Sequence, residues 1–303
     1  MSAGLSDLSD SLRDDAQHRW LVTGAGGLLG SEVVSTIRRT RPADAVTGTT
    51  RADLDVTAAD HDQFRTIVAG YDVVLNCAGW TDVDAAESHQ AEAFAVNAEA
   101  VRVLAAACAS TGVRLAHLST DYVFDGLSDE PYTESAVGSP VNAYGRTKLA
   151  GERAVTDELG DRGVIVRTAW LYGARGRSFV RTIVERAVAA RPIEVVEDLR
   201  GQPTWVRPVA ERLVALGAMA DAGGVYHATC RGDASWFEFA REAYRLVGAD
   251  PDLVLPVSSA TLKRAARRPS PSILDDVRGT KAGLDPMPRW QEALSAALVE
   301  LAG

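Results

Sequence analysis

The stretch RWLVTGAGGLLG, residues 19–30, decides the fold. Its first part is an apolar run typical of a buried strand, and it leads directly into a glycine-rich turn that opens a helix. Gly24, Gly27 and Gly30 follow a G-x-x-G-x-x-G spacing. In a dinucleotide-binding turn, such glycines allow the tight bend, the approach of a pyrophosphate and close packing of the helix on the strand. The stretch therefore predicts a dinucleotide site at the start of an α/β domain.

Strand and helix patterns alternate on the C-terminal side of this turn. Short apolar runs predict strands at 44–50, 71–79, 113–120 and 163–173. Helical spacing predicts a helix over 91–111, with Phe94, Val101, Leu104 and Cys108 on one buried stripe, and another over 142–155. Strands separated by helices form parallel sheets with right-handed crossovers. The fold class predicted is α/β, a Rossmann-like doubly wound parallel sheet.

The pattern becomes looser after Trp170, where short, turn-rich pieces separate the helices. We expect residues 1–18 to be a disordered polar leader and 19–170 to form the Rossmann domain. We expect about 206–230 to rejoin that domain, while 171–205 and 231–303 form a smaller C-terminal substrate-binding region.

Composition narrows the class of protein. The chain has 303 residues, 46% hydrophobic and 24% charged, and its formal net charge of -9 argues against general nucleic-acid binding. No apolar run is expected to approach the ~20 residues of a membrane span, and the start lacks the apolar core of an export signal, so we predict a cytoplasmic protein without membrane contact. The widely spaced Cys77, Cys108 and Cys230 indicate reduced thiols and no metal site.

The end of the second predicted strand bears on the choice of cofactor. Sites for NAD usually place an acidic residue there, but this chain has Thr49, Thr50 and Arg51. Hydroxyls and a guanidinium suit a 2′-phosphate, so we expect NADPH, with NADH as the alternative if Arg51 is only a solvated loop residue. Asp53 and Asp55 are candidates for adenine or ribose contacts.

The most informative pair is Tyr144 and Lys148. Lysine occurs only three times in the chain, at 148, 263 and 281, and Lys148 follows Tyr144 by one helical turn. Residues at i and i+4 share a helix face, and a neighbouring ammonium lowers the pKa of a phenol, which normally titrates near ~10. Thr120 ends a strand at the ligand-binding edge of the sheet, where its hydroxyl can bond a substrate carbonyl. We predict these three as the catalytic residues.

With these residues in place, the chain resembles the extended short-chain dehydrogenase/reductases, and within them the dTDP-4-dehydrorhamnose reductase family of deoxysugar 4-ketoreductases. The resemblance runs from about Trp20 to the C-terminus and rests on TGAGGLLG, RADLDVT, NCAGWTDVDAAE, STDYVFDG, NAYGRTKLAGE, VRTAWLYG, GQPT and RRPSPSILD, in the order of the family. It implies that Tyr144 donates a proton, that Lys148 tunes it and holds the cofactor ribose, and that Thr120, Asp121 and Trp170 contact the sugar. The remaining cofactor contacts expected are Leu28, Leu29, Val56, Gly79, Trp80, Thr81 and Asn97, which line the site or brace its loop.

The resemblance implies NADPH-dependent reduction of the C4 ketone of a dTDP-linked 4-keto-6-deoxy sugar by a monomer or homodimer. Arg200, Arg264, Arg267 and Arg268 are candidates for pyrophosphate contacts or for a solvated basic face. The chain departs from the family where Leu199 replaces a Gln before the GQPT turn. Two alternatives stay open. A sugar-nucleotide dehydratase or epimerase shares the fold, although a dehydratase has a Glu at the position of Tyr122, and the non-catalytic methionine adenosyltransferase β subunit also keeps Y-x-x-x-K.

Overall fold

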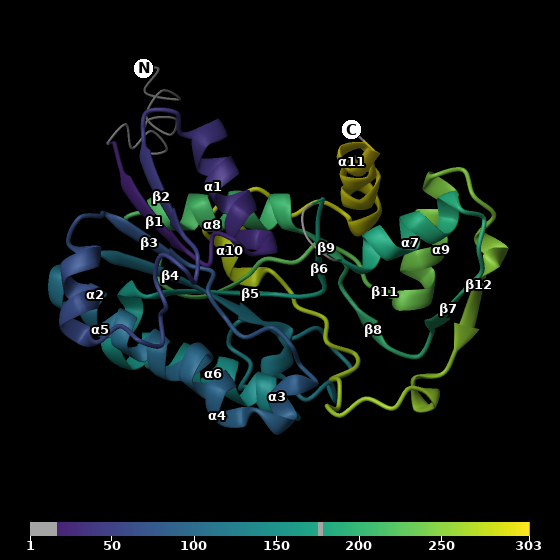
Figure 1. The fold of residues 1–303 in the computed structure, drawn as a ribbon, viewed down its shortest axis with the longest axis horizontal. Coiled ribbons are helices and arrows are strands. Elements are labelled where there is room, and N and C mark those ends of the chain that lie inside the picture. Colours follow the sequence, from purple (N-terminus) through teal and green to yellow (C-terminus); the bar gives the residue numbers. More distant parts are fainter. Residues whose placement is uncertain (1–16, 175–177, 303) are drawn as a thin grey trace, which may run out of the picture.

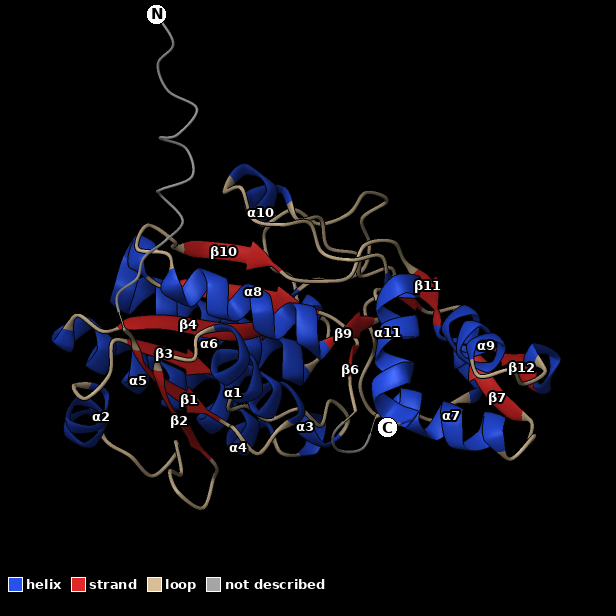
Figure 2. Cartoon of the chain, turned by 90° about the horizontal axis from the view of Figure 1, so that it is seen from above, coloured by secondary structure: helices blue, strands red, loops and turns tan. Residues whose placement is uncertain are grey.

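The computed structural model describes residues 17–174 and 178–302, so the first sixteen residues of the predicted polar leader lie outside the described residues. Six parallel strands form the central sheet in the spatial order β10-β5-β4-β3-β1-β2; Figure 1 labels β1 to β5, and Figure 2 labels β10. Their bounds are β1 Arg19–Thr23, β2 Ala45–Thr49, β3 Val73–Asn76, β4 Arg114–Thr120, β5 Val164–Thr168 and β10 Gly224–His227. The strand order reverses between β1 and β3, which is the ligand-binding point of a doubly wound sheet. The predicted fold class is confirmed.

Helices cover both faces of the sheet, as Figure 1 shows. On one face α1 (Leu28–Thr40) packs against α8 (Val206–Ala218), and on the other α5 (Ala100–Thr111) packs against α2 (His61–Val68) and α6 (Ala143–Leu159). Successive strand residues point to opposite faces, and a parallel sheet is covered on both. Accordingly, Trp20 and Val22 of β1 belong to the apolar cluster under α1 and α8, whereas Leu21 belongs to the one under α2 and α5.

The long helix predicted over 91–111 contains a change of winding. It comprises α4 (Gln90–Phe94), a π-helical turn η2 (Ala95–Glu99) and α5 (Ala100–Thr111). The wider turn changes the phase of the helix, so Val101, Leu104 and Cys108 are buried while Phe94 is 48% exposed. The prediction that Phe94 shares the buried stripe is therefore wrong.

The same segment corrects the expectation that no apolar run approaches the length of a membrane span. By length and composition alone, Gln90–Thr111 is long and apolar enough to cross a membrane. Half of that window is buried inside the protein, and α5 packs against α2 and α6. A core helix has this environment.

Beyond β5 the chain builds a smaller lobe at one end of the central sheet (Figure 2). It includes β6 Leu171–Tyr172, α7 Phe179–Val188, β7 Ile193–Val196, β8 Arg200–Gly201, β9 Thr204–Trp205, β11 Ala234–Ser235, α9 Trp236–Leu246, β12 Val254–Val257 and α11 Trp290–Ala302. Strand β10 lies in the central sheet, and α10 (Val277–Lys281) packs against it. Part of the range 231–303 that we assigned to the substrate region thus lies on the main sheet.

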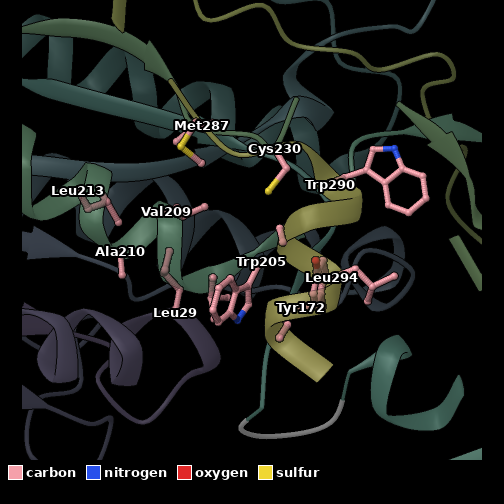
Figure 3. Packing of buried hydrophobic residues seen from close by; sticks show 14 of the residues in the cluster. Leu29, Tyr172, Trp205, Val209, Ala210, Leu213, Cys230, Met287, Trp290 and Leu294 are labelled. Atoms are coloured by element: carbon pink, nitrogen blue, oxygen red, sulfur yellow. The ribbon is translucent and has the colours of Figure 1, made fainter. Parts of the chain in front are cut away.

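The two parts share one apolar core. Figure 3 shows Leu29 of α1 and Val209 of α8 in one apolar cluster with two residues of the smaller lobe, Trp205 of β9 and Leu294 of α11. Trp205 is 7% exposed and Leu294 is fully buried. Burial of such side chains contributes roughly 1.5–3 kcal/mol each, so the smaller lobe is anchored firmly at the carboxyl end of the sheet.

Candidate active site

A cavity of about 830 Å³ lies at the carboxyl ends of the strands. It brings together most of the residues that the sequence analysis selected: Gly24, Gly27, Leu28, Leu29, Gly30, Thr50, Arg51, Asp55, Val56, Gly79, Trp80, Thr81, Thr120, Asp121, Tyr144 and Trp170. Thr49, Asp53, Asn97 and Lys148 do not line it. The strand ends thus converge where a doubly wound sheet holds its ligand.

The glycine turn forms one wall of this cavity. Gly24 has φ +69°, and a Cβ there would lie 2.7 Å from the backbone nitrogen of Ala78. A Cβ on Gly30 would lie 2.2 Å from the carbonyl oxygen of Gly24, so the helix and the turn are in close contact. Helix α1 begins after Gly27 without a side-chain cap, which leaves its first amides available to an anion. These features fit a dinucleotide pyrophosphate.

The end of β2 forms the opposite rim. The hydroxyl of Thr50 donates to Asp53 at 2.7 Å, while the exposed Arg51 pairs with Asp55 at 3.4 Å. Hydrogen bonds from Thr57 lower the pKa of Asp55. The hydroxyl of Thr49 points instead toward the carbonyl of Val22 on β1. Thr50 and Arg51, but not Thr49, are therefore positioned for a ribose phosphate.

The loop after β3 is fixed by Asn97. The side-chain oxygen of Asn97 accepts from the Trp80 amide at 2.8 Å, and its nitrogen donates to the Trp80 carbonyl and to Thr147. Asn97 is fully buried inside the π-helical turn, which directs it at this loop. Of the two roles expected for Asn97, the structure supports bracing the loop.

Thr120 and Tyr144 both line the cavity. Thr120 caps the short helix η3 (Asp121–Val123), accepts from the Tyr122 amide at 3.2 Å and donates to Asp121 at 3.0 Å. Burial raises the pKa of the Tyr144 phenol, whereas a hydrogen bond with Thr120 lowers it. Burial also raises the pKa of Asp121, to about 6. The site therefore holds a phenol that keeps its proton at neutral pH.

Lys148 lies on the same face of α6 as Tyr144 but is only 4% exposed. Its ammonium nitrogen donates to the carbonyl of Leu118 at 2.6 Å and approaches His117 at 3.4 Å. Lys148 is not among the groups that shift the pKa of Tyr144. The expected lowering of the phenol pKa is therefore absent, because burial dominates and the amine is directed beneath β4. Burial in turn lowers the pKa of Lys148 to about 8.

A second cavity, of about 410 Å³, adjoins the first through the shared residues Tyr122, Trp170 and Trp236. The rings of Trp170 and Trp236 stack with centroids 3.7 Å apart. Trp170 has φ +43°, and Leu199 lies on the cavity wall in place of the family's Gln. An apolar, aromatic wall beside the cavity of Tyr144 suits a sugar or a base.

The four candidate arginines differ in their surroundings. Arg264 and Arg268 line the second cavity. Arg268 forms a two-pronged pair with Asp84 at 2.5 and 2.6 Å, and Arg200 pairs with Asp233 and Glu238. Arg264 has no carboxylate within ion-pair distance among residues 17–174 and 178–302. Arg264 is therefore the best placed of the four to meet a phosphate, whereas Arg267 lines neither cavity.

Comparisons with known proteins agree with this geometry. A family model described as RmlD substrate binding domain matches residues 18–302. A dTDP-4-dehydrorhamnose reductase from Streptomyces griseus is 49% identical over 291 residues, which is 94% of each chain. The chain belongs to the dTDP-4-dehydrorhamnose reductase family.

Two further members of this family are similar over nearly the whole chain. A dTDP-4-keto-6-deoxy-D-glucose reductase from Streptomyces niveus is 46% identical, covering 92% of this chain and 96% of its own. The crystal structure of a dTDP-4-dehydrorhamnose reductase from Bacillus anthracis in complex with NADP has a TM-score of 0.87 at 33% identity, covering 94% of this chain and all of that one.

Sequence reasoning missed several residues of this family member's site. Three residues that line the cavities were not selected from the sequence: Cys77, Leu118 and Trp236. A fourth, Arg264, was one of four candidate arginines, and the sequence did not distinguish it from the other three. A signal existed for Trp236, because Ser235 and Glu238 form a capping box that places it at the first residue of α9. No comparable local pattern marks the other three.

Proposed function

We propose that the chain catalyses the NADPH-dependent reduction of the C4 ketone of a dTDP-4-keto-6-deoxyhexose. The observation that carries this proposal is that Thr120 and Tyr144 line the same strand-end cavity as the glycine turn, and that this cavity shares Trp170 with the second cavity. A proton donor at the junction of a dinucleotide site and an aromatic pocket fits a ketoreductase. The reductase names of the relatives, and the NADP in the complex from Bacillus anthracis, support the same assignment.

The residues present fit the dinucleotide. The amides at the start of α1 would hold its pyrophosphate, and Thr50 and Arg51 would hold the 2′-phosphate at the end of β2. The loop Gly79–Thr81, braced by Asn97, would border the rest of the cofactor. Bound NADPH would supply the hydride for the carbonyl carbon.

Tyr144 would deliver the proton to the carbonyl oxygen. Its raised pKa keeps the phenol protonated at neutral pH, and the alkoxide that develops on hydride addition is a far stronger base than a phenolate. Thr120 at present donates its hydroxyl hydrogen to Asp121. That hydrogen must turn toward the ketone oxygen when substrate binds, and the Tyr122 amide would keep the Thr120 oxygen in place during the change.

The second cavity would receive the nucleotide end of the substrate. Trp170 and Trp236 offer flat apolar surface to a sugar or to thymine, and Arg264, which has no ion-pair partner within the described part of the chain, offers its guanidinium to the diphosphate. Leu199 replaces a polar contact with an apolar one, which favours a deoxygenated position on the sugar near this wall.

The test is NADPH oxidation with dTDP-4-dehydrorhamnose and related 4-keto sugars, followed by NMR of the product. Tyr144→Phe should lower kcat by about 10²–10⁴-fold while NADPH binding is retained, because only the proton donor is removed. Tyr71→Phe, on the loop before β3, is the matched control and should leave kcat unchanged.

Equal rates for wild type and Tyr144→Phe would contradict the role of Tyr144. Tight NADPH binding by the wild type without turnover of any 4-keto sugar would contradict the reductase function and favour a non-catalytic regulatory subunit.

A further inference from the structure

A buried polar chain runs beneath the active site from β1 to α6. Thr23 donates to the side-chain oxygen of Asn76 at 2.6 Å, the nitrogen of Asn76 contacts Nδ1 of His117 at 3.1 Å, and Nε2 of His117 lies 3.4 Å from Nζ of Lys148. All four side chains are at most 4% exposed. The proposed reaction does not use His117, yet a buried, titratable side chain in contact with Lys148 requires an explanation.

A backbone amide fixes the direction of this chain. The amide of Ala78 can only donate, and it donates to the side-chain oxygen of Asn76 at 3.2 Å. The other end of the Asn76 amide, which is a donor, must therefore face His117. Because Nδ1 of His117 accepts that hydrogen bond, a neutral imidazole carries its own proton on Nε2. That N–H points at Lys148.

The contacts of Lys148 then differ in which protonation state they favour. The carbonyl of Leu118 accepts a hydrogen from the nitrogen at 2.6 Å whether Lys148 is an ammonium or an amine. Only the neutral amine of Lys148 has a lone pair that can accept a hydrogen bond from Nε2–H of His117. In an ammonium, all the N–H groups are donors, so Nε2–H of His117 would face another donor. We propose that His117 is a positioning residue that presents Nε2–H to Lys148 and thereby favours its neutral form.

Other groups around Lys148 act in both directions. Burial favours the amine, whereas the carboxylate of Glu152, one turn further along α6, favours the ammonium. A thiolate at Cys77 would also favour the ammonium, but burial raises the pKa of Cys77 to about 12 and keeps it a neutral thiol. Arg167 holds Glu152 through two hydrogen bonds at 2.6 and 2.9 Å, which weakens the pull of that carboxylate on Lys148. Burial and Lys148 together hold the pKa of His117 well below its ordinary value, so His117 stays neutral.

The protonation state of Lys148 has a consequence for catalysis, which rests on the proposed function. If Lys148 must be charged to bind the cofactor ribose, activity falls as pH rises through the Lys148 pKa. His117 then sets the alkaline limit of the reaction. The protonation of Lys148 itself can be measured without substrate or cofactor, so the inference is testable whatever the reaction proves to be.

The scarcity of lysine makes the measurement direct. With only three lysines in the chain, ¹³Cε-labelled protein gives three lysine signals, and Lys148→Arg identifies that of Lys148. In His117→Gln the side-chain amide can turn its oxygen to Lys148, so the Lys148 pKa should rise by about one unit. Thr23→Val is the matched control: it removes a hydroxyl from the same chain but leaves the Ala78 amide, and the Lys148 pKa should stay as in the wild type. An unchanged or lower Lys148 pKa in His117→Gln overturns the proposal.

A second measurement needs no variant that might fail to fold. ¹⁵N spectra of the wild-type histidines should show His117 as the neutral Nε2–H tautomer between pH 5 and 8, with His117 assigned by through-bond and through-space connectivity. A Nδ1–H tautomer, or titration in that range, overturns the proposal. If the wild type reduces keto sugars, the alkaline limb of kcat/KM should move to higher pH in His117→Gln in step with the Lys148 pKa, and a stationary limb contradicts only the catalytic consequence.

Discussion

We propose that the cofactor preference depends on Arg51. Its side chain is 85% exposed and reaches the rim of the cavity next to Asp55, with no acidic residue at the end of β2 itself. A guanidinium here stabilises a 2′-phosphate more than a 2′-hydroxyl, because only the phosphate adds the attraction of opposite charges to the hydrogen bond. The identity of one exposed side chain can thus separate two cofactors that differ only in that phosphate.

Arg51→Asp should therefore reverse the preference. We expect kcat/KM with NADPH to fall by about tenfold or more, as one charge-assisted contact is lost and one repulsion is gained, while kcat/KM with NADH changes little. Steady-state kinetics with both cofactors check this. Arg65→Asp, which places the same charge change on α2 away from the cavity, should leave the ratio unaltered. A parallel fall with both cofactors would show that Arg51 does not read the phosphate.

Asp121 predicts a pH dependence of stability. Its carboxylate is 1% exposed, accepts hydrogen bonds from Ser272 at 2.6 Å and Thr120 at 3.0 Å, and has a pKa raised from 3.8 to about 6. Because the raised pKa penalises the charged form in the folded state, this group lowers stability as pH rises from about 4 to 6. Two units correspond to at most about 3 kcal/mol.

Asp121→Asn should remove this contribution. The free energy of unfolding of the variant minus that of the wild type should be larger at pH 7.5 than at pH 4.5, by about 2 kcal/mol, in urea titrations at the two pH values. Comparing the variant with the wild type at each pH cancels the contributions that their shared titrating groups make to the free energy of unfolding. Asp129→Asn, in an exposed loop, should follow the wild type at both pH values. Parallel curves for Asp121→Asn would mean that the carboxyl has the same pKa in the folded and unfolded states, and would contradict the raised pKa.

At the scale of elements, β8 positions the aromatic wall. Gly201 of β8 pairs with Ala234 of β11, and a Cβ on Gly201 would lie 2.5–2.7 Å from the indole of Trp170. The same indole stacks on Trp236, the first residue of α9. The orientation of Trp170 therefore depends on two elements. Strand β8 has a glycine, Gly201, where a side chain would strike the indole, and α9 begins with Trp236, 66 residues away from Trp170 in sequence.

Gly201→Ala should displace Trp170. We expect kcat/KM for the sugar nucleotide to fall by about tenfold or more, because small misplacements of substrate are costly, while the melting temperature falls only modestly. Gly70→Ala is the control, since its Cβ would meet only the Ile67 carbonyl, at an ordinary 3.6 Å. An unaltered kcat/KM in Gly201→Ala would show that Trp170 does not set the substrate position.

The elements also show what could be predicted from sequence. The glycine turn, the strands of the sheet and the Tyr144–Lys148 pair depend on short-range spacing, so they could be predicted without the fold. The π-helical turn could not be predicted, because the residues of a π-helical turn are of the same types as those of an α-helix and leave no distinct pattern in the sequence. The direction of Lys148 toward Leu118 and His117 depends on how closely α6 approaches β4, and the raised pKa of Tyr144 depends on burial by segments distant in sequence. Contacts of that range have no local signature.

At the scale of the whole molecule, an ion pair joins the chain just before α3 to the segment that carries Arg264 and Arg268. Asp84, just before α3 (Ala85–Ser88), accepts from both terminal nitrogens of Arg268 and from the amide of Ala266 at 2.9 Å. Arg268 holds the pKa of Asp84 at about 2, so the pair stays ionised at any working pH. The segment containing Arg264 and Arg268 is thereby fastened to the dinucleotide-binding half.

Asp84→Asn should loosen this link without touching the reacting groups. An amide can keep one of the hydrogen bonds but cannot accept both prongs of the guanidinium, so the wall that carries Arg264 loses its fixed position. We expect KM for the sugar nucleotide to rise by about tenfold, the equivalent of one charge-assisted hydrogen bond, with kcat and NADPH affinity changed less than about twofold. Asp252→Asn, which removes a surface pair with Arg241, is the matched control and should change none of the three. A fall in kcat with KM unchanged would place the effect of Asp84 on the chemical step. It would refute the role of Asp84 in fixing the cavity wall that carries Arg264 and Arg268.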